Sequence, residues 1–273
     1  MAQNKKIGVF DSGFGGIDIL RGIVSELPQY DYIYLGDTAR SPYGTRSSEV
    51  VYEFSKQAVD FLFSRGAGLI IFACNTASSD ALRRIQQEYL PRKHPDKRVL
   101  GVLIPAAEDA VAKTKNGRVG VIATEGTVRS CAFPRELIKL KKEVQVFQQA
   151  CPLLVPLVEE GEERSKAAHI LVEQYLAPLR KKKIDTLILG CTHYGLLERQ
   201  IKKAAGSHVR IVSEARVVPK KLRDYLRRHQ DIEGTLSKHR SVQFFSTDLT
   251  ERFTRLGSRF FGKKIRAAKA VLK

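Results

Sequence analysis

The chain of 273 residues has few cysteines and no long hydrophobic segment. Its four cysteines form no CxxC pair, and four in a chain of this length make no disulfide framework. The six histidines show no helical or hairpin pairing with them, so we expect no metal site. No apolar run approaches the roughly 18 residues of a membrane span, and Met1 to Lys6 contain no signal-peptide core. We therefore expect a cytoplasmic protein with free thiols and no membrane contact.

Acidic residues are scarce relative to basic ones. The 47 Lys and Arg residues stand against 29 Asp and Glu, a net charge of +18 that attracts polyanions. Much of the excess positive charge falls in four clusters, which are Lys139 to Lys142, Arg180 to Lys183, Lys220 to Arg228 and Arg259 to Lys273. These clusters lack the interleaved aromatic residues that an RNA-stacking surface needs. We interpret them as solvated helix faces and a tail, with nucleic-acid binding as the alternative.

Short apolar runs alternate with longer amphipathic stretches, a pattern typical of βαβ units and a parallel sheet. The apolar fraction of 43% is that of a globular protein, so we predict an α/β fold. The expected strands are Lys6 to Phe10, Tyr32 to Leu35, Leu69 to Ala73, Val99 to Val102, Arg118 to Ile122, Val144 to Gln148, Thr186 to Leu189 and Val209 to Val212. The expected helices are Gly16 to Leu27, Ser47 to Arg65, Ser78 to Glu88, Ala106 to Lys115, Thr127 to Leu140, Ser165 to Leu179, Leu196 to Ala205 and Ala215 to Arg228.

An internal repeat is visible in two pairs of segments. The segment that begins at Lys6 resembles the one that begins at Arg118, an offset of 118 − 6 = 112. The segments that end in Cys74 and Cys191 are offset by 191 − 74 = 117. Two similar offsets in the same order indicate duplication of one α/β unit. We expect the Pro- and Lys-rich stretch over residues 91–98 to cross between the two units.

Two cysteines follow matching apolar runs, Leu69-Ile-Ile-Phe-Ala-Cys74 and Leu187-Ile-Leu-Gly-Cys191. Open α/β sheets bind ligands at the carboxyl ends of their strands, so each thiol stands where chemistry is expected. Two thiols that face one ligand from opposite sides can each exchange a proton with the same carbon. For Cys131 and Cys151 we expect only the role of small buried hydrophobic residues.

Four further segments carry candidate site residues, each with an ordinary structural alternative. Asp11 and Ser12 lie in a Gly-rich turn that is suited to binding a carboxylate or to catalysis. The alternative is an ordinary strand–helix turn in which Asp11 caps the helix. The loop of Tyr43 and Gly44 reads as a binding loop or as an ordinary connection. His193 is able to tune the thiol of Cys191 or to be structural, and Glu159 is a candidate acid or a surface carboxylate.

Several motifs together resemble those of glutamate racemase, a member of the cofactor-independent aspartate/glutamate racemase group. They run in the right order from the first strand to about residue 200 and are Asp11-Ser12-Gly13, Asp37-Thr-Ala-Arg40 with Pro42-Tyr43-Gly44, Cys74-Asn75-Thr76-Ala77-Ser78, Ala123-Thr124 with Gly126-Thr127, Pro156-Leu-Val-Glu159 and Leu189-Gly-Cys191-Thr192-His193-Tyr194. A weaker match, Glu251-Arg-Phe-Thr-Arg-Leu, lies near the end of the chain. As a set these motifs are highly specific.

The resemblance implies two pseudo-symmetric three-layer α/β domains with parallel sheets and the active site at their interface. The first domain would comprise residues 1–97 and 213–273, and the inserted second domain residues 98–212. The resemblance also implies that Cys74 and Cys191 are the catalytic thiols, with Asp11 assisting the first and His193 the second. It makes Glu159 a further acid. The implied substrate-binding residues are Asp11, Ser12, Tyr43, Gly44, Asn75, Thr76, Thr192 and His193.

The implied activity is interconversion of L- and D-glutamate without cofactor or metal, which supplies D-glutamate for peptidoglycan. We expect a homodimer with glutamate as its small-molecule substrate. An enzyme acting on aspartate or another amino acid is the alternative, and the loop around Tyr43 favours glutamate. The chain departs from the family pattern at Gly195, where a proline commonly follows His-Tyr, and at Val212-Ser213-Glu214, which replaces a usual Asp-Ser pair.

Overall fold

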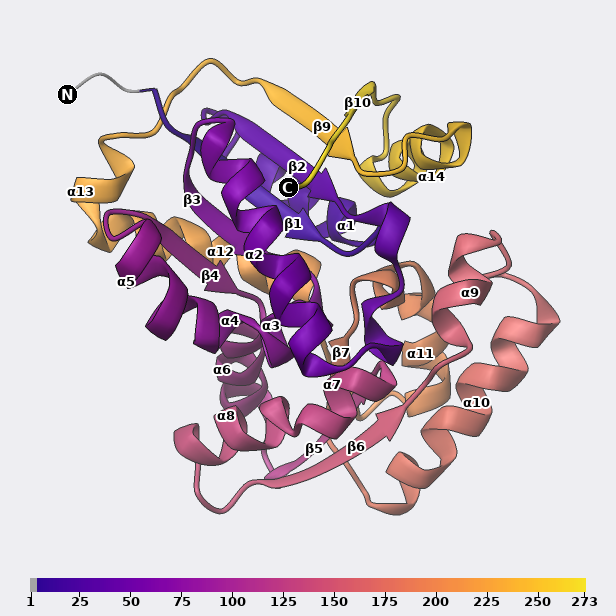
Figure 1. Ribbon diagram of the computed structural model, residues 1–273. Coiled ribbons are helices and arrows are strands. Elements are labelled where there is room, and N and C mark those ends of the chain that lie inside the picture. Colours follow the sequence, from indigo (N-terminus) through magenta and orange to yellow (C-terminus); the bar gives the residue numbers. More distant parts are fainter. Residues whose placement is uncertain (1–3) are drawn as a thin grey trace.

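Two parallel β-sheets form the framework of the protein, for which a computed structural model describes residues 4–273. The six-stranded sheet has the order β10-β9-β2-β1-β3-β4, and the four-stranded sheet has the order β6-β5-β7-β8. The strands of the first sheet are β1 (Lys6–Asp11), β2 (Tyr32–Gly36), β3 (Ala67–Phe72), β4 (Arg98–Gly101), β9 (Val242–Ser246) and β10 (Ala267–Lys269). Those of the second are β5 (Arg118–Ala123), β6 (Gln145–Ala150), β7 (Thr186–Gly190) and β8 (Arg210–Ser213). Figure 1 shows β1, β2 and β9 in its upper part and β5 and β6 in its lower part.

The two sheets repeat one topology. In the first, β2-β1-β3-β4 are neighbours, and in the second β6-β5-β7-β8 follow one another in the corresponding order, with every pair parallel. The repeat expected from the offsets of 112 and 117 residues is therefore present in the strand order. β9 and β10 extend only the first sheet.

Helices cover both faces of each sheet, because the buried strands are apolar on both sides. In β1, Val9 packs with α1, α12 and α14 on one face, whereas Phe10 packs with α2 on the other. In β7, Leu187 packs with α10 and α11, whereas Ile188 packs with α6 and α8. Each sheet with its helices is thus a three-layer α/β unit, and we call the two units the first and second lobes. The predicted fold class is confirmed.

The α-helices have the bounds α1 (Gly16–Glu26), α2 (Ser48–Ser64), α3 (Asn75–Asp80), α4 (Leu82–Arg84), α5 (Leu90–Lys93), α6 (Leu103–Lys113), α7 (Glu125–Ser130), α8 (Ala132–Leu140), α9 (Leu154–Glu159), α10 (Lys166–Lys181), α11 (Glu198–Ala205), α12 (Glu214–Arg228), α13 (Gln230–Glu233) and α14 (Glu251–Phe261). The 3-10 helices are η1 (Thr38–Arg40), η2 (Tyr43–Thr45) and η4 (Thr192–Leu197), and η3 (Ile85–Tyr89) is a π-helix. Ser47 caps α2 by accepting from the N–H of Val50, as its sequence position suggested.

Several local expectations need correction. Cys131, which was expected to be buried, is exposed, and the single helix expected over Ser78 to Glu88 is divided into α3, α4 and η3. β4 hydrogen-bonds with β3, so Arg98–Gly101 lies in the first sheet although the expected second domain began at residue 98. Residues 91–93 are helical, and the chain passes to the second lobe only after β4. The single helix expected over 127–140 is two helices, because Cys131 has a left-handed backbone with φ of 51°. β9, β10 and α14 were not predicted.

The return to the first lobe occurs between β8 and α12. β8 ends at Ser213 in the second sheet, and α12 begins at Glu214 and packs against α1. Within residues 4–273 no helix is long and apolar enough to cross a bilayer. The expectation about a signal peptide rests partly on residues 1–3, which lie outside the described residues.

Candidate active site

The carboxyl ends of equivalent strands carry the candidate catalytic groups of both lobes. Asp11 is the last residue of β1, Cys74 follows β3 by two residues, and Cys191 follows β7 directly. In parallel sheets these ends share one edge, so the repeat presents one thiol from each lobe. Both thiols are buried, with 5% of Cys74 and 7% of Cys191 exposed.

The thiol of Cys74 lies at the start of α3 among hydrogen-bonding groups. Its Sγ atom is 3.4 Å from Oγ of Ser12 and accepts from the backbone N–H of Ala77 at 3.4 Å. Burial, and next the negative charge of Asp11, raise the pKa of Cys74 to about 12, against the opposing hydrogen bonds from Ser12 and Ala77. The thiol of Cys74 therefore favours its neutral form at neutral pH. The hydrogen bonds from Ser12 and Ala77 favour the thiolate but do not outweigh burial.

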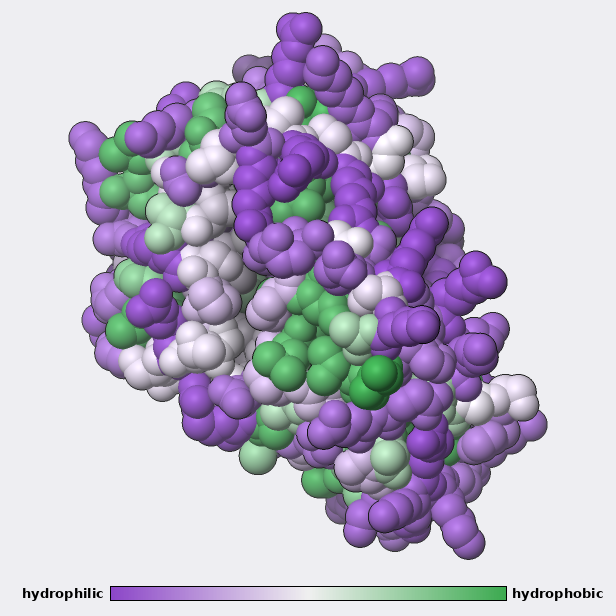
Figure 2. Space-filling model, turned by 90° about the vertical axis from the view of Figure 1, so that its right-hand side faces the viewer, coloured by the Kyte–Doolittle hydropathy of each residue, from purple (hydrophilic) through white to green (hydrophobic). Residues whose placement is uncertain are grey.

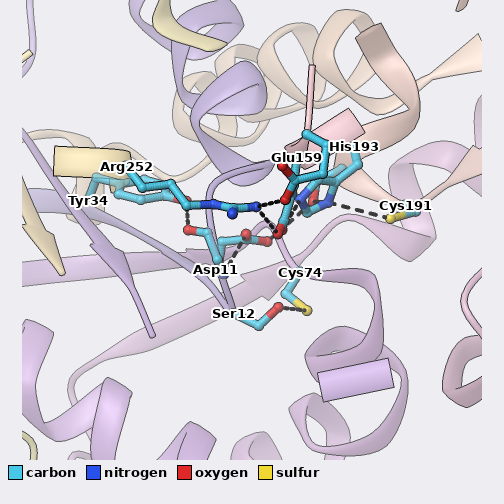
Figure 3. A network of polar contacts seen from close by, with 11 residues as sticks. Asp11, Ser12, Tyr34, Cys74, Glu159, Cys191, His193 and Arg252 are labelled. Atoms are coloured by element: carbon cyan, nitrogen blue, oxygen red, sulfur yellow. Dashed lines mark hydrogen bonds and ion pairs between the residues drawn. The ribbon is translucent and has the colours of Figure 1, made fainter. Parts of the chain in front are cut away.

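The thiol of Cys191 belongs to a chain of contacts within the second lobe. Nδ1 of His193 lies 3.8 Å from its Sγ, and Nε2 of the same ring lies 3.0 Å from Oε1 of Glu159. Figure 3 shows the imidazole between the carboxylate and the thiol. Burial raises the pKa of Cys191 well above its usual value, against a hydrogen bond from the backbone of His193. A carboxylate that orients a histidine toward a second group is the arrangement expected for moving a proton.

Asp11 connects the two halves of the site. Its Oδ2 accepts from the N–H of Gly13 at 3.0 Å, and its Oδ1 accepts from Oγ1 of Thr192, in the second lobe, at 3.5 Å. Burial raises the pKa of this carboxyl, although the nearby His193 acts in the opposite direction. Asp11 thus lies close to the catalytic groups of both lobes.

A cleft of about 560 Å3 between the lobes leads toward these groups. Pro42, Gly44 and Arg252 line it from the first lobe, and Thr124 and Glu159 line it from the second. Neither Cys74 nor Cys191 is among its lining residues. A substrate that enters from this side therefore needs some separation of the lobes before it reaches the thiols.

The chain is similar to proteins of one enzyme family over most of its length. The family model described as Asp/Glu/Hydantoin racemase matches residues 7–218. The chain belongs to this racemase family. It is 44% identical to the glutamate racemase of Geobacter metallireducens over 262 residues, 96% of this chain and 94% of that protein.

Solved structures of glutamate racemases share the fold of this racemase. The Bacillus anthracis enzyme superimposes with a TM-score of 0.91 at 36% identity, covering 99% of this chain and 98% of that one. The Francisella tularensis enzyme, solved in complex with D-glutamate, superimposes with a TM-score of 0.88 at 31% identity and the same two coverages. Racemases are isomerases, so this chain is an enzyme of that class.

Other expected site residues of the racemase meet where the lobes touch. Oγ1 of Thr76 lies 3.1 Å from Oγ1 of Thr124 in the second lobe. A Cβ on Gly44 would lie 2.9 Å from Cβ of Thr124, so the backbone of the expected binding loop approaches the second lobe too closely for a side chain. The residues expected at the site thus come together, with the exception of the Tyr43 side chain.

The Tyr43 side chain points into the core of the first lobe. It is buried, its hydroxyl donates to Oδ2 of Asp37, and its ring packs against Phe54 with centroids 5.6 Å apart. The motif predicted the whole loop as a binding loop. Pro42 and Gly44 line the cleft, whereas Tyr43 does not.

Arg252 is a site residue that the sequence prediction missed. It begins in α14 of the first lobe and reaches α9 of the second, where its guanidinium is 3.6 Å from Oε2 of Glu159 and 2.8 Å from Oε1 of Glu160. Figure 3 shows Arg252 joining the contact chain at Glu159. The weak C-terminal resemblance at Glu251-Arg252 was the only signal that could have indicated it.

Both of these departures from the family pattern involve a buried carboxyl group. A Cβ on Gly195 would lie 2.5 Å from Oδ2 of Asp18, so a larger residue here would require the Asp18 carboxyl to move. Glu214, in the altered segment after β8, is buried, and its Oε2 accepts from Nδ2 of Asn75 at 2.7 Å. Gly195 thus leaves room for the carboxyl of Asp18, and Glu214 forms a hydrogen bond with Asn75.

Proposed function

We propose that this enzyme interconverts L-glutamate and D-glutamate by a two-base mechanism in which Cys74 and Cys191 exchange protons with the α-carbon. The observation that carries the proposal is the presence of one buried thiol at the same strand end of each lobe. The relatives and solved structures named above are glutamate racemases, which supports glutamate as the substrate.

In the proposed reaction one cysteine, as a thiolate, takes the proton from the α-carbon. The other cysteine, as a neutral thiol, delivers its proton to the opposite face. The C–H bond breaks on one side, a new C–H bond forms on the other, and the two sulfur atoms end with exchanged protonation states. The reverse reaction uses the same groups in exchanged roles, so no net proton is gained or lost.

Substrate charge would help to generate the required thiolate. Burial keeps the pKa of Cys74 and Cys191 above the usual value of a thiol, so both favour the neutral form at neutral pH. The α-ammonium group of glutamate brings a positive charge into the same low-dielectric site, which favours one thiolate. Ser12 would then orient the proton of Cys74, and His193 with Glu159 would accept or orient the proton of Cys191.

The carbanion formed at the α-carbon would be stabilised by hydrogen bonds to the substrate carboxylate. The donors available around the thiols are the side chains of Ser12, Asn75, Thr76 and Thr192 and neighbouring backbone N–H groups. Buried donors of this kind are already oriented before the reaction, so they stabilise developing charge without reorganisation. Closure of the lobes would exclude water and strengthen them further.

The deciding experiment incubates the pure enzyme with L-glutamate in deuterated water. We expect the optical rotation to fall toward zero while deuterium enters the α-position. Parallel incubation with L-aspartate and other L-amino acids tests the alternative substrates. Racemisation of aspartate in preference to glutamate would contradict the proposed substrate, and no exchange with any amino acid would contradict the proposed reaction.

We further propose that the reaction needs no cofactor or metal and that its D-glutamate product supplies peptidoglycan synthesis in the cytoplasm. The paired thiols supply both acid and base, which leaves no step that requires another group. Activity should survive dialysis against a chelator without added pyridoxal phosphate. Loss of activity that a metal ion or this cofactor restores would contradict the proposal.

Two proposals concern partners. Figure 2 shows the face that carries α9, α10 and α14, which is mainly hydrophilic with a hydrophobic cluster near its centre. Leu153, which precedes α9, and Ile170, in α10, are exposed to 52% and 64%. We propose a homodimer, which light scattering would reveal as twice the mass of 30.6 kDa.

The net charge of +18 supports nucleic-acid binding as a second proposed role, which a salt-dependent DNA shift assay tests.

A further inference from the structure

Glu214 is a buried carboxyl that the proposed reaction does not use. It is the first residue of α12, at the point where the chain returns from β8 to the first lobe, and only 3% of it is exposed. Its Oε2 accepts a hydrogen bond of 2.7 Å from Nδ2 of Asn75, the residue after Cys74. The carboxyl thus contacts a residue of the site directly.

Two buried oxygen atoms of this pair have no hydrogen-bond partner among residues 4–273. They are Oε1 of Glu214 and Oδ1 of Asn75. Buried acceptors without a donor are costly, and both atoms belong to side chains that are already joined by one hydrogen bond. A proton on Glu214 would supply a donor to this pair. A neutral carboxyl has one O–H donor and a carbonyl acceptor, and a primary amide has two N–H donors and a carbonyl acceptor, so the two groups can bond at two points.

The surroundings of Glu214 favour this proton. Asp18 and Cys191 line the same small cavity, of about 10 Å3, which is at the lower limit for one water molecule. Burial, together with the negative charge of Asp11, raises the pKa of Glu214 to about 8, although the hydrogen bond from Asn75 opposes the shift. Three basic residues on α1 and α12 form ion pairs with other carboxylates, and they are Arg21 with Asp18, Arg216 with Glu198 and Lys221 with Glu108.

We propose that Glu214 is a positioning residue which, in its protonated form, holds the amide of Asn75 by a two-point carboxylic acid–amide pair. This inference rests on the proposed function, because it concerns how Asn75 meets the substrate. Two-point pairing uses Oδ1 and one N–H of the amide and leaves the second N–H free. That N–H then donates to an oxygen atom of the substrate carboxylate.

Ionisation of Glu214 breaks this arrangement. A carboxylate has no proton to donate, so Oδ1 of Asn75 loses its partner and faces a negative charge. The same charge repels the carboxylates of the substrate and opposes a thiolate at Cys191. Substrate binding should therefore weaken as the pH rises past about 8, the pKa of this group.

The test compares three proteins by the pH dependence of KM for L-glutamate between pH 6.5 and 9.5. Glu214→Gln places a neutral amide of the same shape against Asn75, so it should keep KM near the wild-type value at pH 7. This variant should also lose the rise in KM that the wild-type protein shows near pH 8. Glu214→Ala should raise KM about tenfold at pH 7, because Asn75 loses its partner. Asp80→Asn is the control, since Asp80 lies on the same helix as Asn75 and its pKa is also raised, by burial, to about 6.

A second measurement does not depend on activity. The side-chain amide signals of Asn75 in the nuclear magnetic resonance spectrum should titrate in the wild-type protein with a midpoint near pH 8. They should not titrate in this range in Glu214→Gln. The control should retain the wild-type titration, because its carboxyl does not contact this amide.

The outcomes separate this inference from the proposed function. If wild-type protein racemises glutamate but Glu214→Gln has the same pH dependence of KM and of the Asn75 signals, the role of Glu214 is wrong and the racemase proposal stands. If the Asn75 signals titrate as expected but no amino acid is racemised, the acid–amide pair stands and the substrate role of Asn75 fails.

Discussion

Gly15 of the first lobe and Thr192 of the second approach each other without room for a methyl group. A Cβ atom on Gly15 would lie 2.3 Å from Oγ1 of Thr192 and 2.8 Å from Nδ1 of His193. A glycine is therefore required at this point for the lobes to meet as they do. The contact lies beside Asp11 and Cys191, so closure and catalytic geometry depend on the same atoms.

We predict that Gly15→Ala lowers kcat/KM by about 100-fold, because displacement of catalytic groups by about 1 Å costs this much. Steady-state kinetics with each enantiomer would measure the effect. Gly13→Ala is the matched control in the same turn, since its Cβ would be 3.4 Å from its nearest neighbour, Oγ of Ser41, and it should lose far less activity. Equal activity of the two variants would contradict the close-contact argument.

The separate thiols give the sharpest prediction. Cys74→Ser and Cys191→Ser should each lower racemisation by about 100- to 10,000-fold, because a hydroxyl is a much poorer base than a thiol near neutral pH. A chlorinated glutamate analogue that loses HCl after one proton abstraction needs only one base. Each variant should therefore process mainly one enantiomer of it, and the two variants should prefer opposite ones. Near-wild-type racemisation by both would exclude the two-thiol mechanism.

Adjacent carboxylates allow a controlled test of the His193 contact. Glu159 is 3.0 Å from His193, whereas Glu160, which is more exposed, contacts only Arg252 among the site residues described here. Glu159→Gln should slow proton exchange at Cys191 by about tenfold or more, because a neutral amide stabilises the imidazolium less. Exchange of the α-proton into deuterated water, measured for each enantiomer, should slow more for the enantiomer that Cys191 deprotonates. Glu160→Gln should change neither rate by more than about twofold.

Asp31 predicts a pH dependence of folding stability. Burial acts to raise its pKa, but hydrogen bonds from Ser237, Ser241 and His239 outweigh burial and hold the pKa below its usual value. A depressed folded-state pKa stabilises the fold above the unfolded-state value near 4, and this contribution is lost as the pH falls through the folded-state pKa.

Asp31→Asn should therefore lower the free energy of unfolding by about 1–3 kcal/mol at pH 7 and by less at pH 3. Urea unfolding at the two pH values measures the difference. Asp96→Asn is the control, because Asp96 is exposed and lies 3.8 Å from Lys5. A deficit for Asp31→Asn that is the same at both pH values would contradict the role of its charge.

The strands that carry the thiols could be predicted from the sequence alone, since apolar runs in a chain of this pattern form buried parallel strands whatever their partners. Cys74 and Cys191 were therefore predictable as strand-end groups, and the offsets between segments indicated the repeated topology. The family motifs added Asp11, His193 and Glu159, whose positions in the sequence lie on the turns and helices next to these strands.

Contacts between segments that are distant in the sequence depend on the tertiary structure. β4 joins the first sheet because of its hydrogen bonds to β3, and no pattern within β4 encodes that partner. Arg252 reaches Glu159, and Glu214 reaches Asn75, across 93 and 139 residues of the chain, which are the differences 252 − 159 and 214 − 75. Local patterns specify which face of an element is buried, whereas contacts between lobes depend on how whole elements pack. For that reason the contacts of Arg252 with Glu159 and of Glu214 with Asn75 could be recognised only after the fold was known.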